Sequence, residues 1–372
     1  MSTARKGQGG TEERKVRYGV VGLGWFSQVA ILPAFQHGAR NSELVALFSG
    51  KEEKLEVLGD RHGAAGRYTY DDYDDVLDSG ALDAVYLALP NHLHAEYAVR
   101  AAKAGVHVLC EKPMAVTEAE CREMISATDD GGVKLMIAYR LHFEEANLRA
   151  IELVNSGAIG EPRFFNAVFA SQVDDEDDIR LNPIEKGGGT LYDIGIYCIN
   201  AARYIFRAEP LCVSAFSSEE LDERFEKADE MTAAVLRFPG DRLAAFVSSF
   251  SGADHDSYSI HGTEGHLTVQ PAFEFDETLV HHLSRNGATK EERFPRRDQV
   301  APEILHFSDC IIEDRQPEPS GKEGLADVQV IEALYRSART GKPVALDVLE
   351  PDERPSLEQE VQRPPVERQE LV

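Results

Sequence analysis

The chain has little cysteine, and none of it is arranged to cross-link the fold. Five cysteines are scattered through 372 residues without a C-x-x-C pair (Cys110, Cys121, Cys198, Cys212 and Cys310). An odd number at such spacings argues against both a disulfide scaffold and a structural zinc site. We therefore expect free thiols in a reducing compartment and no bound metal.

Long hydrophobic runs are also missing. No stretch approaches the ~18 consecutive apolar residues that a membrane-spanning helix requires. Residues 1–15 are polar and charged, without the apolar segment of a secretory signal. The sequence therefore predicts a cytoplasmic protein with no membrane partner and a flexible leader over residues 1–15.

Positive charge is scarce as well. The 39 Lys and Arg residues are outnumbered by 65 Asp and Glu residues, which gives a formal net charge of −26, and only 12 of the basic residues are lysine. A field of this sign repels phosphate backbones, which disfavours a nucleic-acid partner. Two explanations of the acidic composition stay open: a surface adapted to high salt, or an ordinary acidic surface with an acidic tail.

Short apolar runs alternate with segments of helical spacing in the first part of the chain. The runs have the length of buried strands and cover residues 17–22, 43–49, 84–89, 107–110 and 134–138; the helical segments cover residues 29–35, 51–62, 72–77, 95–104 and 118–127. Strands that are apolar throughout and alternate with helices predict a parallel sheet covered on both faces. We expect an α/β domain over residues 16–139, and about two domains from the length.

The pattern changes after residue 139. Strand-like segments separated by turn signals predict an antiparallel meander, at residues 163–172, 211–217, 231–238, 243–249, 257–261 and 266–270. Helical spacing occurs at residues 146–155, 189–206, 301–313 and 325–338. We expect a second α/β domain over residues 140–349. Residues 350–372 are rich in Pro and Glu and poor in apolar residues, which predicts a disordered acidic tail.

A glycine-rich turn follows the first expected strand and opens a helix. It reads Gly22-Leu23-Gly24-Trp25-Phe26-Ser27, a G-x-G-x-x-S pattern. Gly22 permits the tight turn, and Gly24 lets backbone N–H groups approach a pyrophosphate at the helix N-terminus, where the dipole favours negative charge. In this context the pattern predicts a dinucleotide-binding turn of the Rossmann type. The alternative is a glycine-rich turn in an unrelated α/β protein.

The end of the second expected strand indicates which dinucleotide is bound. An NAD site has an Asp or Glu there, which hydrogen-bonds the ribose 2′-hydroxyl. Here the strand ends at Ser49 and Gly50, and Lys51 and Lys54 follow. A hydroxyl, free backbone N–H groups and two ammonium groups suit a 2′-phosphate, so we favour NADP over NAD. The alternative is that the two lysines are solvated helix charges.

Two further strands end in polar segments at the edge of the sheet where ligands bind in open α/β folds. The third strand runs into Leu89-Pro90-Asn91-His92-Leu93-His94, and the fourth into Cys110-Glu111-Lys112-Pro113-Met114. Burial of Lys112 beside a positively charged nicotinamide would lower its pKa. The alternative is a surface turn closed by a salt bridge between Glu111 and Lys112.

A second glycine run precedes a helix in the second half. Gly187, Gly188 and Gly189 allow close approach to a ligand. Asp193 and Tyr197 follow at a spacing of i and i+4, so they share one helical face. An acid and a phenol on one face form a plausible proton-transfer pair. The alternative is a helix-dipole Asp and a packed core Tyr.

Together these motifs resemble the Gfo/Idh/MocA oxidoreductase family. The segments that carry the likeness are G-L-G-x-x-S, L-P-N-x-L-H-A-E, C-E-K-P-M-A, G-G-G-x-L-x-D-I-G-I-Y-x-x-N and residues 323–344. Within the family the chain is most similar to glucose–fructose oxidoreductases and NADP-dependent aldose 1-dehydrogenases. The resemblance spans about residues 17–344 and implies a Rossmann domain followed by an α/β domain with an open, mostly antiparallel sheet, whose outer face often mediates a homodimer or homotetramer.

The resemblance also implies roles for individual residues. It implies Lys112 as the active-site lysine, Asp193 as the group that positions the sugar, and Tyr197 as the acid/base. The implied cofactor contacts are Gly22, Leu23, Gly24, Trp25, Phe26, Ser49, Gly50, Lys54, Leu89, Pro90, Asn91, His94, Glu111, Lys112, Arg140 and Arg180. No metal is implied.

The resulting hypothesis is an NADP-dependent oxidoreductase that oxidises an aldose at C1 to the lactone. A phenol needs a nearby positive charge and hydrogen bonds to act as a base near neutral pH, and Lys112 supplies such a charge. The short segment before the first strand favours an enzyme that releases its cofactor. Two alternatives remain: a dehydrogenase of a cyclitol or trans-dihydrodiol with the same fold, and a non-catalytic NADP-binding redox sensor.

Overall fold

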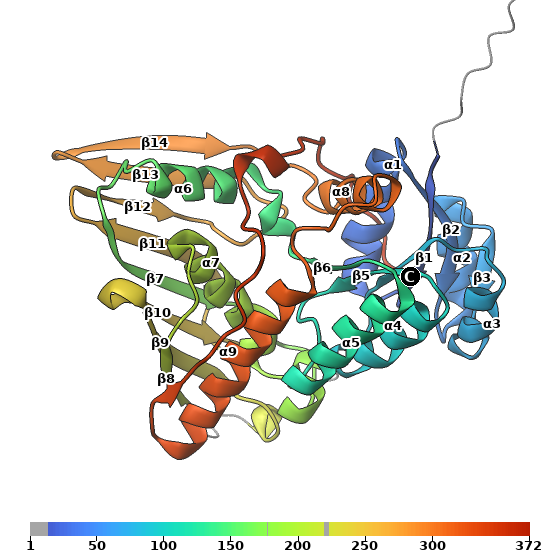
Figure 1. Ribbon diagram of the computed structural model, residues 1–372, viewed down its shortest axis with the longest axis horizontal. Helices are drawn as coiled ribbons and strands as arrows, with labels where there is room; N and C mark the ends of the chain where they lie inside the picture. The colour runs from blue at the N-terminus through green and yellow to red at the C-terminus, as the bar shows by residue number, and fades with distance from the viewer. Residues whose placement is uncertain (1–13, 177, 219–222) are drawn as a thin grey trace, which may run out of the picture.

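The computed structural model describes residues 14–176, 178–218 and 223–372, so residues 1–13 of the expected leader lie outside the described part. Two β-sheets of different character stand next to each other, one of six strands and one of nine (Figure 1). The predicted α/β class, with a parallel sheet followed by a mostly antiparallel one, is therefore confirmed. Among the described residues, no helix has the length and hydrophobicity needed to span a bilayer.

The first sheet is parallel throughout and has the strand order β3-β2-β1-β4-β5-β6. Its strands are β1 (Val16–Val21), β2 (Ser42–Phe48), β3 (Gly66–Tyr68), β4 (Ala84–Leu87), β5 (His107–Glu111) and β6 (Leu135–Ala138). The connecting helices are α1 (Leu32–Gly38), α2 (Glu52–His62), α3 (Tyr73–Asp78), α4 (His94–Lys103) and α5 (Glu118–Gly131). This order reverses direction between β1 and β4, which is where dinucleotides bind in a Rossmann fold.

The second sheet has the order β14-β13-β12-β11-β7-β10-β9-β8-β15, and only the β7–β10 pair is parallel. Its strands are β7 (Pro162–Ala170), β8 (Cys212–Ser217), β9 (Met231–Phe238), β10 (Arg242–Ser249), β11 (His255–Gly262), β12 (Gly265–Val269), β13 (Leu279–Arg285), β14 (Ala288–Phe294) and β15 (Val344–Ala345). Helices α6 (Glu145–Asn155) and α7 (Ile196–Phe206) cover one face (Figure 1). The sequence pattern did not predict β13 and β14, because this edge hairpin is largely polar.

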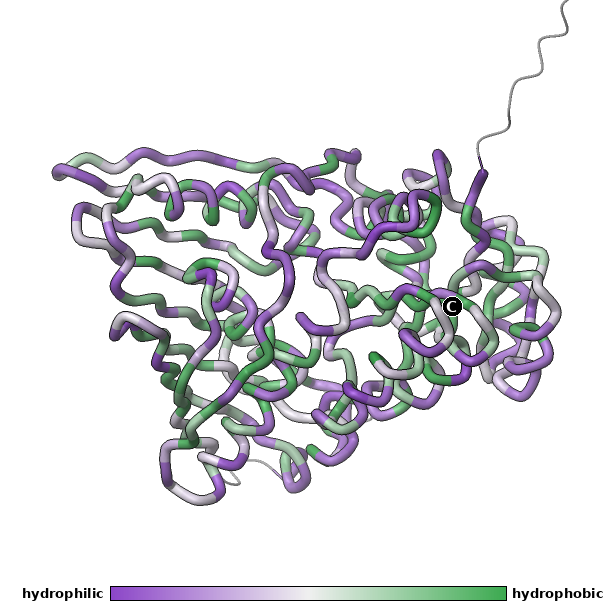
Figure 2. The backbone as a smooth tube through the Cα atoms, in the orientation of Figure 1, coloured by the Kyte–Doolittle hydropathy of each residue, from purple (hydrophilic) through white to green (hydrophobic). Residues whose placement is uncertain are grey.

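The opposite face of the second sheet carries exposed apolar side chains. Residues of β9 alternate strictly between exposed and buried, and the strands of this sheet carry both hydrophobic and hydrophilic residues (Figure 2). Large hydrophobic side chains point outward from four adjacent strands: Phe164, Phe216, Met231, Val235 and Leu243. We call this set the outer apolar face.

The chain returns to the first domain after the second sheet. Helix α8 (Ala301–Ile312) packs against α1, β1 and β2. Ile304 and Phe307 belong to the same buried cluster as Tyr18 of β1, and the Tyr18 hydroxyl lies 2.7 Å from Ser308 Oγ. The expected substrate domain of residues 140–349 thus contributes a helix to the core of the cofactor domain, a long-range contact that the sequence pattern does not encode.

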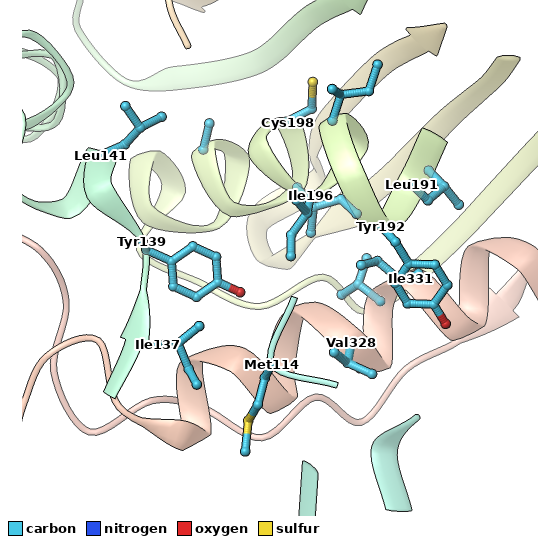
Figure 3. Packing of buried hydrophobic residues seen from close by; sticks show 14 of the residues in the cluster. Met114, Ile137, Tyr139, Leu141, Leu191, Tyr192, Ile196, Cys198, Val328 and Ile331 are labelled. Atoms are coloured by element: carbon cyan, nitrogen blue, oxygen red, sulfur yellow. The ribbon is translucent and has the colours of Figure 1, made fainter. Parts of the chain in front are cut away.

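Helix α9 (Gly321–Thr340) joins the two domains. It contacts α5 on one side and β8 on the other. Its Val328 belongs to one continuous hydrophobic cluster that also contains Met114, Ile137 and Tyr139 from the first domain and Ile196 from the second (Figure 3). The hydrophobic core therefore continues through the domain junction, from the parallel sheet to the second domain.

The structure places residues 350–372 against both domains, whereas the sequence predicts a disordered tail. Arg354 pairs with Glu209 of the second domain at 2.7 Å, and the last residues reach the cofactor domain. The Val372 N–H donates to Gln28 Oε1 at 2.8 Å, Arg61 donates to the Glu370 carbonyl at 2.6 Å, and the Asp298 N–H donates to the Arg363 carbonyl at 3.3 Å. The tail is held by polar groups outside it, and its own Leu357 and Val372 also pack against the hydrophobic clusters. Composition alone cannot reveal such a partner.

Candidate active site

The glycine turn after β1 has the backbone that its sequence predicts. Gly22 has φ +100°, and a Cβ at this position would lie 2.3 Å from the Ala88 carbonyl oxygen, so only glycine fits. Ser27 Oγ closes the turn by donating to the Gly22 carbonyl at 2.7 Å. At Gly24, which is exposed, no described atom lies within 4 Å of the place where a Cβ would stand. The turn is therefore tight behind Gly22 and open in front of Gly24, as a pyrophosphate site requires.

Lys54 lies next to this turn in the folded chain. Its ammonium donates to the Leu23 carbonyl at 2.8 Å, and burial together with Lys51 lowers its pKa. Ser49 is buried, and its Oγ accepts from the Lys51 N–H at 3.1 Å. A lysine held at the turn, a hydroxyl and the adjacent Gly50 form a set that fits a phosphate on the ribose.

An aromatic group covers the other side of the turn. The rings of Trp25 and Phe26 lie 5.9 Å and 5.7 Å from Phe275, which comes from the second domain. Trp25 remains 56% exposed. The turn thus lies at the cleft between the two domains.

The segment after β4 also reaches the second domain. The Asn91 side-chain amide donates to the Gly187 carbonyl at 2.6 Å, next to the second glycine run. His94 is fully buried, and its ring nitrogens lie 2.9 Å from the carbonyls of Leu89 and Pro113. The structure therefore places His94 between the loops after β4 and β5, where it holds them together, while Pro90 and Asn91 border the cleft.

Lys112, Asp193 and Tyr197 lie together at the end of β5. The Lys112 ammonium donates to the Asp193 carbonyl at 2.7 Å and to its carboxylate at 3.1 Å. It also lies 4.9 Å from the centre of the Tyr197 ring. Asp193 is in a π-helical turn, Leu191–Gly195, and Tyr197 is in the first turn of α7. Side chains from both domains thus form one constellation, and Lys112 pairs across the cleft instead of with Glu111.

The pKa of Lys112 departs from the expectation. Burial lowers it, but Tyr197, Asp193 and Glu111 raise it, and the net effect is a raised pKa. The sequence analysis predicted that an adjacent nicotinamide lowers this pKa. The phenol and the two carboxyl groups of the protein raise it instead, because they stabilise the charged ammonium. Lys112 is therefore a stable cation. Beneath it, burial raises the pKa of Glu111, whose carboxylate accepts from the Tyr86 hydroxyl at 2.8 Å.

Two arginines adjoin the constellation. Arg140 is buried at the start of the second domain, and its guanidinium donates to the Tyr197 hydroxyl at 3.3 Å. Arg180 pairs with Asp178 at 2.7 Å and lies 3.9 Å from the Asp193 carboxylate. Both predicted residues thus lie near the acid and the phenol.

The sequence analysis missed several residues that complete the site. Gln299 and the Phe273 carbonyl accept hydrogen bonds from Arg140. Glu303 of α8 is buried, and burial and the charge of Glu111 raise the pKa of Glu303 well above the ordinary value. These residues lie in connections outside any recognisable motif. No local pattern could have identified them.

The domain junction also encloses a pocket next to the constellation. Its lining residues are Lys112, Ala138, Tyr139, Arg140, Leu141, Ile196, Tyr197 and Asn200. Within residues 14–176, 178–218 and 223–372, no group of three or more His, Cys, Asp or Glu side chains is arranged to hold a metal ion.

Two family profiles match the chain. A profile described as an oxidoreductase family with an NAD-binding Rossmann fold matches residues 16–139. A second profile, the GFO/IDH/MocA C-terminal domain, matches residues 147–268. Their order along the chain is that of the two sheets.

Relatives of the chain include sugar dehydrogenases. A D-xylose 1-dehydrogenase [NADP(+)] of Haloarcula marismortui is 34% identical over 90% of this chain and 94% of its own length. D-xylose 1-dehydrogenase (NADP(+)) 2 of Haloferax volcanii is 32% identical over 89% of this chain and 99% of its own. Among solved structures, an aldose-aldose oxidoreductase from Caulobacter crescentus complexed with glycerol is 38% identical, with a TM-score of 0.85, over 90% of this chain and 100% of that one.

Proposed function

Because the chain belongs to the GFO/IDH/MocA family of oxidoreductases, we propose that it is an NADP-dependent dehydrogenase that oxidises an aldose at C1 to the lactone. The observation that carries this proposal is the junction of Lys112, Asp193 and Tyr197. Lys112 and Asp193 are 81 positions apart in the sequence, yet they meet at the carboxyl edge of the parallel sheet. The relatives named for xylose and aldose chemistry support the choice of substrate class.

The residues of the first domain fit NADP. The open space at Gly24 and the helix that follows suit the pyrophosphate. Ser49, Gly50 and Lys54 are suited to the 2′-phosphate, because the strand end carries no carboxylate that would compete with it. Leu89, Pro90 and Asn91 would border the adenosine half, and Glu111 and Lys112 the nicotinamide half. When bound, NADP supplies the acceptor of the C1 hydride.

The side chains of the protein perform the proton chemistry. Tyr197 accepts the proton of the C1 hydroxyl, and the lasting positive charge of Lys112 stabilises the phenolate form of Tyr197. Asp193 is held by Lys112 and faces Arg180, so its carboxylate can orient sugar hydroxyls. The two domains enclose the reacting groups and limit access of water.

The first experiment follows the ultraviolet absorbance of the purified protein before and after addition of D-xylose or D-glucose, with NADP and then NAD. Steady reduction of added NADP, with NAD much less effective, is the expected result. Lys112→Ala and Tyr197→Phe should each reduce kcat at least about a hundredfold, while the Kd for NADP stays within about threefold. Near-wild-type turnover in both variants, or no reduction with any sugar, contradicts the proposal.

We further propose that the protein forms a homodimer or homotetramer through the second sheet. The outer apolar face, which comprises Phe164, Phe216, Met231, Val235 and Leu243, supports this, because an exposed apolar patch of this kind marks an interaction site. Light scattering of the purified protein measures the oligomeric state.

The five cysteines are free thiols, which supports the proposed cytoplasmic location. We also propose residues 16–139 and 140–349 as the cofactor and substrate domains.

A further inference from the structure

The ring of Tyr197 is flanked by two cations. The Lys112 ammonium lies 4.9 Å from the ring centre and the Arg140 guanidinium carbon 5.1 Å from it. Only Arg140 also contacts the hydroxyl, to which its Nη2 donates at 3.3 Å. The remaining neighbours of the ring include Phe169 and Phe273, at 5.6 and 5.8 Å between ring centres. An apolar enclosure of this kind strengthens the influence of the two charges on the phenol.

Arg140 is fixed in this orientation by the second domain. Its Nη1 donates to Gln299 Oε1, and its Nη2 donates to the Phe273 carbonyl. Gln299 is in turn held by a hydrogen bond of 3.2 Å from its Nε2 to the Glu274 carbonyl. The Arg140 side chain is buried, with 7% of its surface exposed. A buried guanidinium held by these hydrogen bonds is a well-oriented, permanently charged group.

The hydrogen bonds of Arg140 surround the phenol, whereas toward the glycine turn its guanidinium carbon makes a ring contact, 5.7 Å from the centre of Phe275. The hydrogen bonds of the Arg140 side chain go to Gln299, Phe273 and Tyr197. A residue that binds a cofactor phosphate keeps its guanidinium available in the cleft. Here the guanidinium donates to the Tyr197 hydroxyl and to two acceptors of the second domain, Gln299 and the Phe273 carbonyl.

We propose that Arg140 is a positioning residue for Tyr197, which it orients and whose phenolate it stabilises by donating a hydrogen bond to the phenol oxygen, with Gln299 holding the guanidinium in place. This inference rests on the proposed function of the site. In the reaction the proton leaves the C1 hydroxyl for the phenolate oxygen, and the hydride leaves C1 for NADP. Arg140 changes neither its charge nor its covalent bonds. In this proposal Tyr197 depends on Arg140 as well as on Lys112 to act as the base.

The test is the pH profile of kcat/KM for Arg140→Met and Arg140→Lys. For Arg140→Met we expect the acidic limb to move to higher pH by about one unit, with a loss of about tenfold near neutral pH and recovery in alkaline solution. Arg140→Lys should restore part of the loss. The KM for NADP should stay within about threefold of the wild type.

A matched control is Arg100→Met. Arg100 also lies over tyrosine rings, 4.8 Å from that of Tyr97 and 4.9 Å from that of Tyr73, but its guanidinium pairs with Asp74 and Glu96 on the helices of the first domain. Its replacement should leave the pH profile unchanged. Gln299→Leu, which frees Arg140 without removing it, should give a smaller shift in the same direction and serves if Arg140→Met does not fold.

Two outcomes of the kinetic and binding measurements overturn the inference. An equal loss at every pH assigns Arg140 a purely structural role, and a large rise in the Kd for NADP with an unmoved profile assigns it to the cofactor. If no aldose is oxidised at all, the proposed function fails, and tyrosinate absorbance still decides the role of Arg140. The titration step that is lost in Tyr197→Phe should move to higher pH in Arg140→Met; an unmoved step contradicts the inference.

Discussion

The Lys112 side chain, which belongs to the first domain, contacts Asp193 and Tyr197 of the second domain. It leaves the end of β5, donates to the backbone and the carboxylate of Asp193, and lies over the ring of Tyr197. The E-K-P motif and the i, i+4 spacing of the acid and the phenol made these three residues candidates, and the family resemblance, not the spacing, favoured them over a helix-dipole Asp and a packed core Tyr. The spacing could not reveal Arg140 and Gln299 as their support, because their contacts depend on how a distant loop folds back over the site.

Glu303 offers a prediction at this scale. It is 1% exposed, and burial and the nearby Glu111 raise its pKa well above 4.5. The native state therefore holds a proton that the unfolded chain releases above pH 4.5, so this residue lowers stability progressively as the pH rises beyond that value. Glu303→Gln, which imitates the protonated acid, should gain about 1 kcal/mol or more in the free energy of unfolding at about pH 8 relative to the wild type.

Urea unfolding at about pH 5 and about pH 8 checks this prediction. The gain should be small at the lower pH and larger at the higher one. Glu313→Gln, at an exposed position just beyond the same helix, is the control and should change neither value by more than about 0.5 kcal/mol. A Glu303→Gln variant that is destabilised more at high pH than at low pH would show that the carboxylate is ionised in the fold.

At the scale of elements, two π-helical turns frame the site. One follows the first glycine run at Ser27–Ile31, and the other follows the second glycine run at Leu191–Gly195. Such turns interrupt the regular i to i−4 ladder and occur frequently at functional sites. At the second turn, the Asp193 carbonyl accepts from Lys112, so that backbone and side chain of one residue serve the same cation.

The two glycines of the first turn should respond differently to alanine. At Gly22 a Cβ would meet the Ala88 carbonyl oxygen at 2.3 Å and the backbone has φ +100°, so Gly22→Ala should cost about 2 kcal/mol or more of stability and weaken NADP binding more than tenfold. Gly24→Ala meets no described atom within 4 Å. It should leave stability within about 1 kcal/mol while still weakening NADP binding.

Thermal unfolding and a fluorescence titration with NADPH measure the two effects separately. Equal losses of stability at the two positions would mean that the turn relaxes around Gly22. Unchanged NADPH binding in Gly24→Ala would place the pyrophosphate elsewhere.

The elements that sequence analysis recovered are those with a strong periodic pattern. The strands β1, β2, β4, β5 and β6 are mostly apolar because most of their side chains are buried between the covering layers of the sheet. The hairpin of β13 and β14 was missed because it lies at the edge of the second sheet, where few positions are buried. Strand β3, of three residues, is too short for a pattern.

For the whole molecule, the dominant property is the net charge of −26. Like charges at this density repel one another in the compact state and favour expansion. Many exposed ion pairs, such as those of Arg67 with Glu56 and Asp60, partly offset this but contribute little each. Either origin of the acidic composition has this physical consequence.

Potassium chloride should therefore stabilise the protein. Raising KCl from about 0.1 M to about 1 M shortens the Debye length from ~10 Å to ~3 Å and screens the repulsion, so the melting temperature at about pH 8 should rise by several degrees. The control is the same pair of salt concentrations near the isoelectric point of about 4.8, where the repulsion is small and the rise should vanish. A melting temperature that falls with salt at pH 8 would show that attractive ion pairs outweigh the repulsion.

The return of α8 to the first domain bears on how the protein is made. On the ribosome, residues 16–139 emerge long before residues 301–312, yet Tyr18 of β1 shares its buried cluster with Ile304 and Phe307. Until α8 has been synthesised, one flank of the nascent cofactor domain stays exposed to water and to chaperones. The dinucleotide site can thus reach its final form only after most of the chain has left the exit tunnel, and translation itself delays the moment at which the enzyme captures its coenzyme.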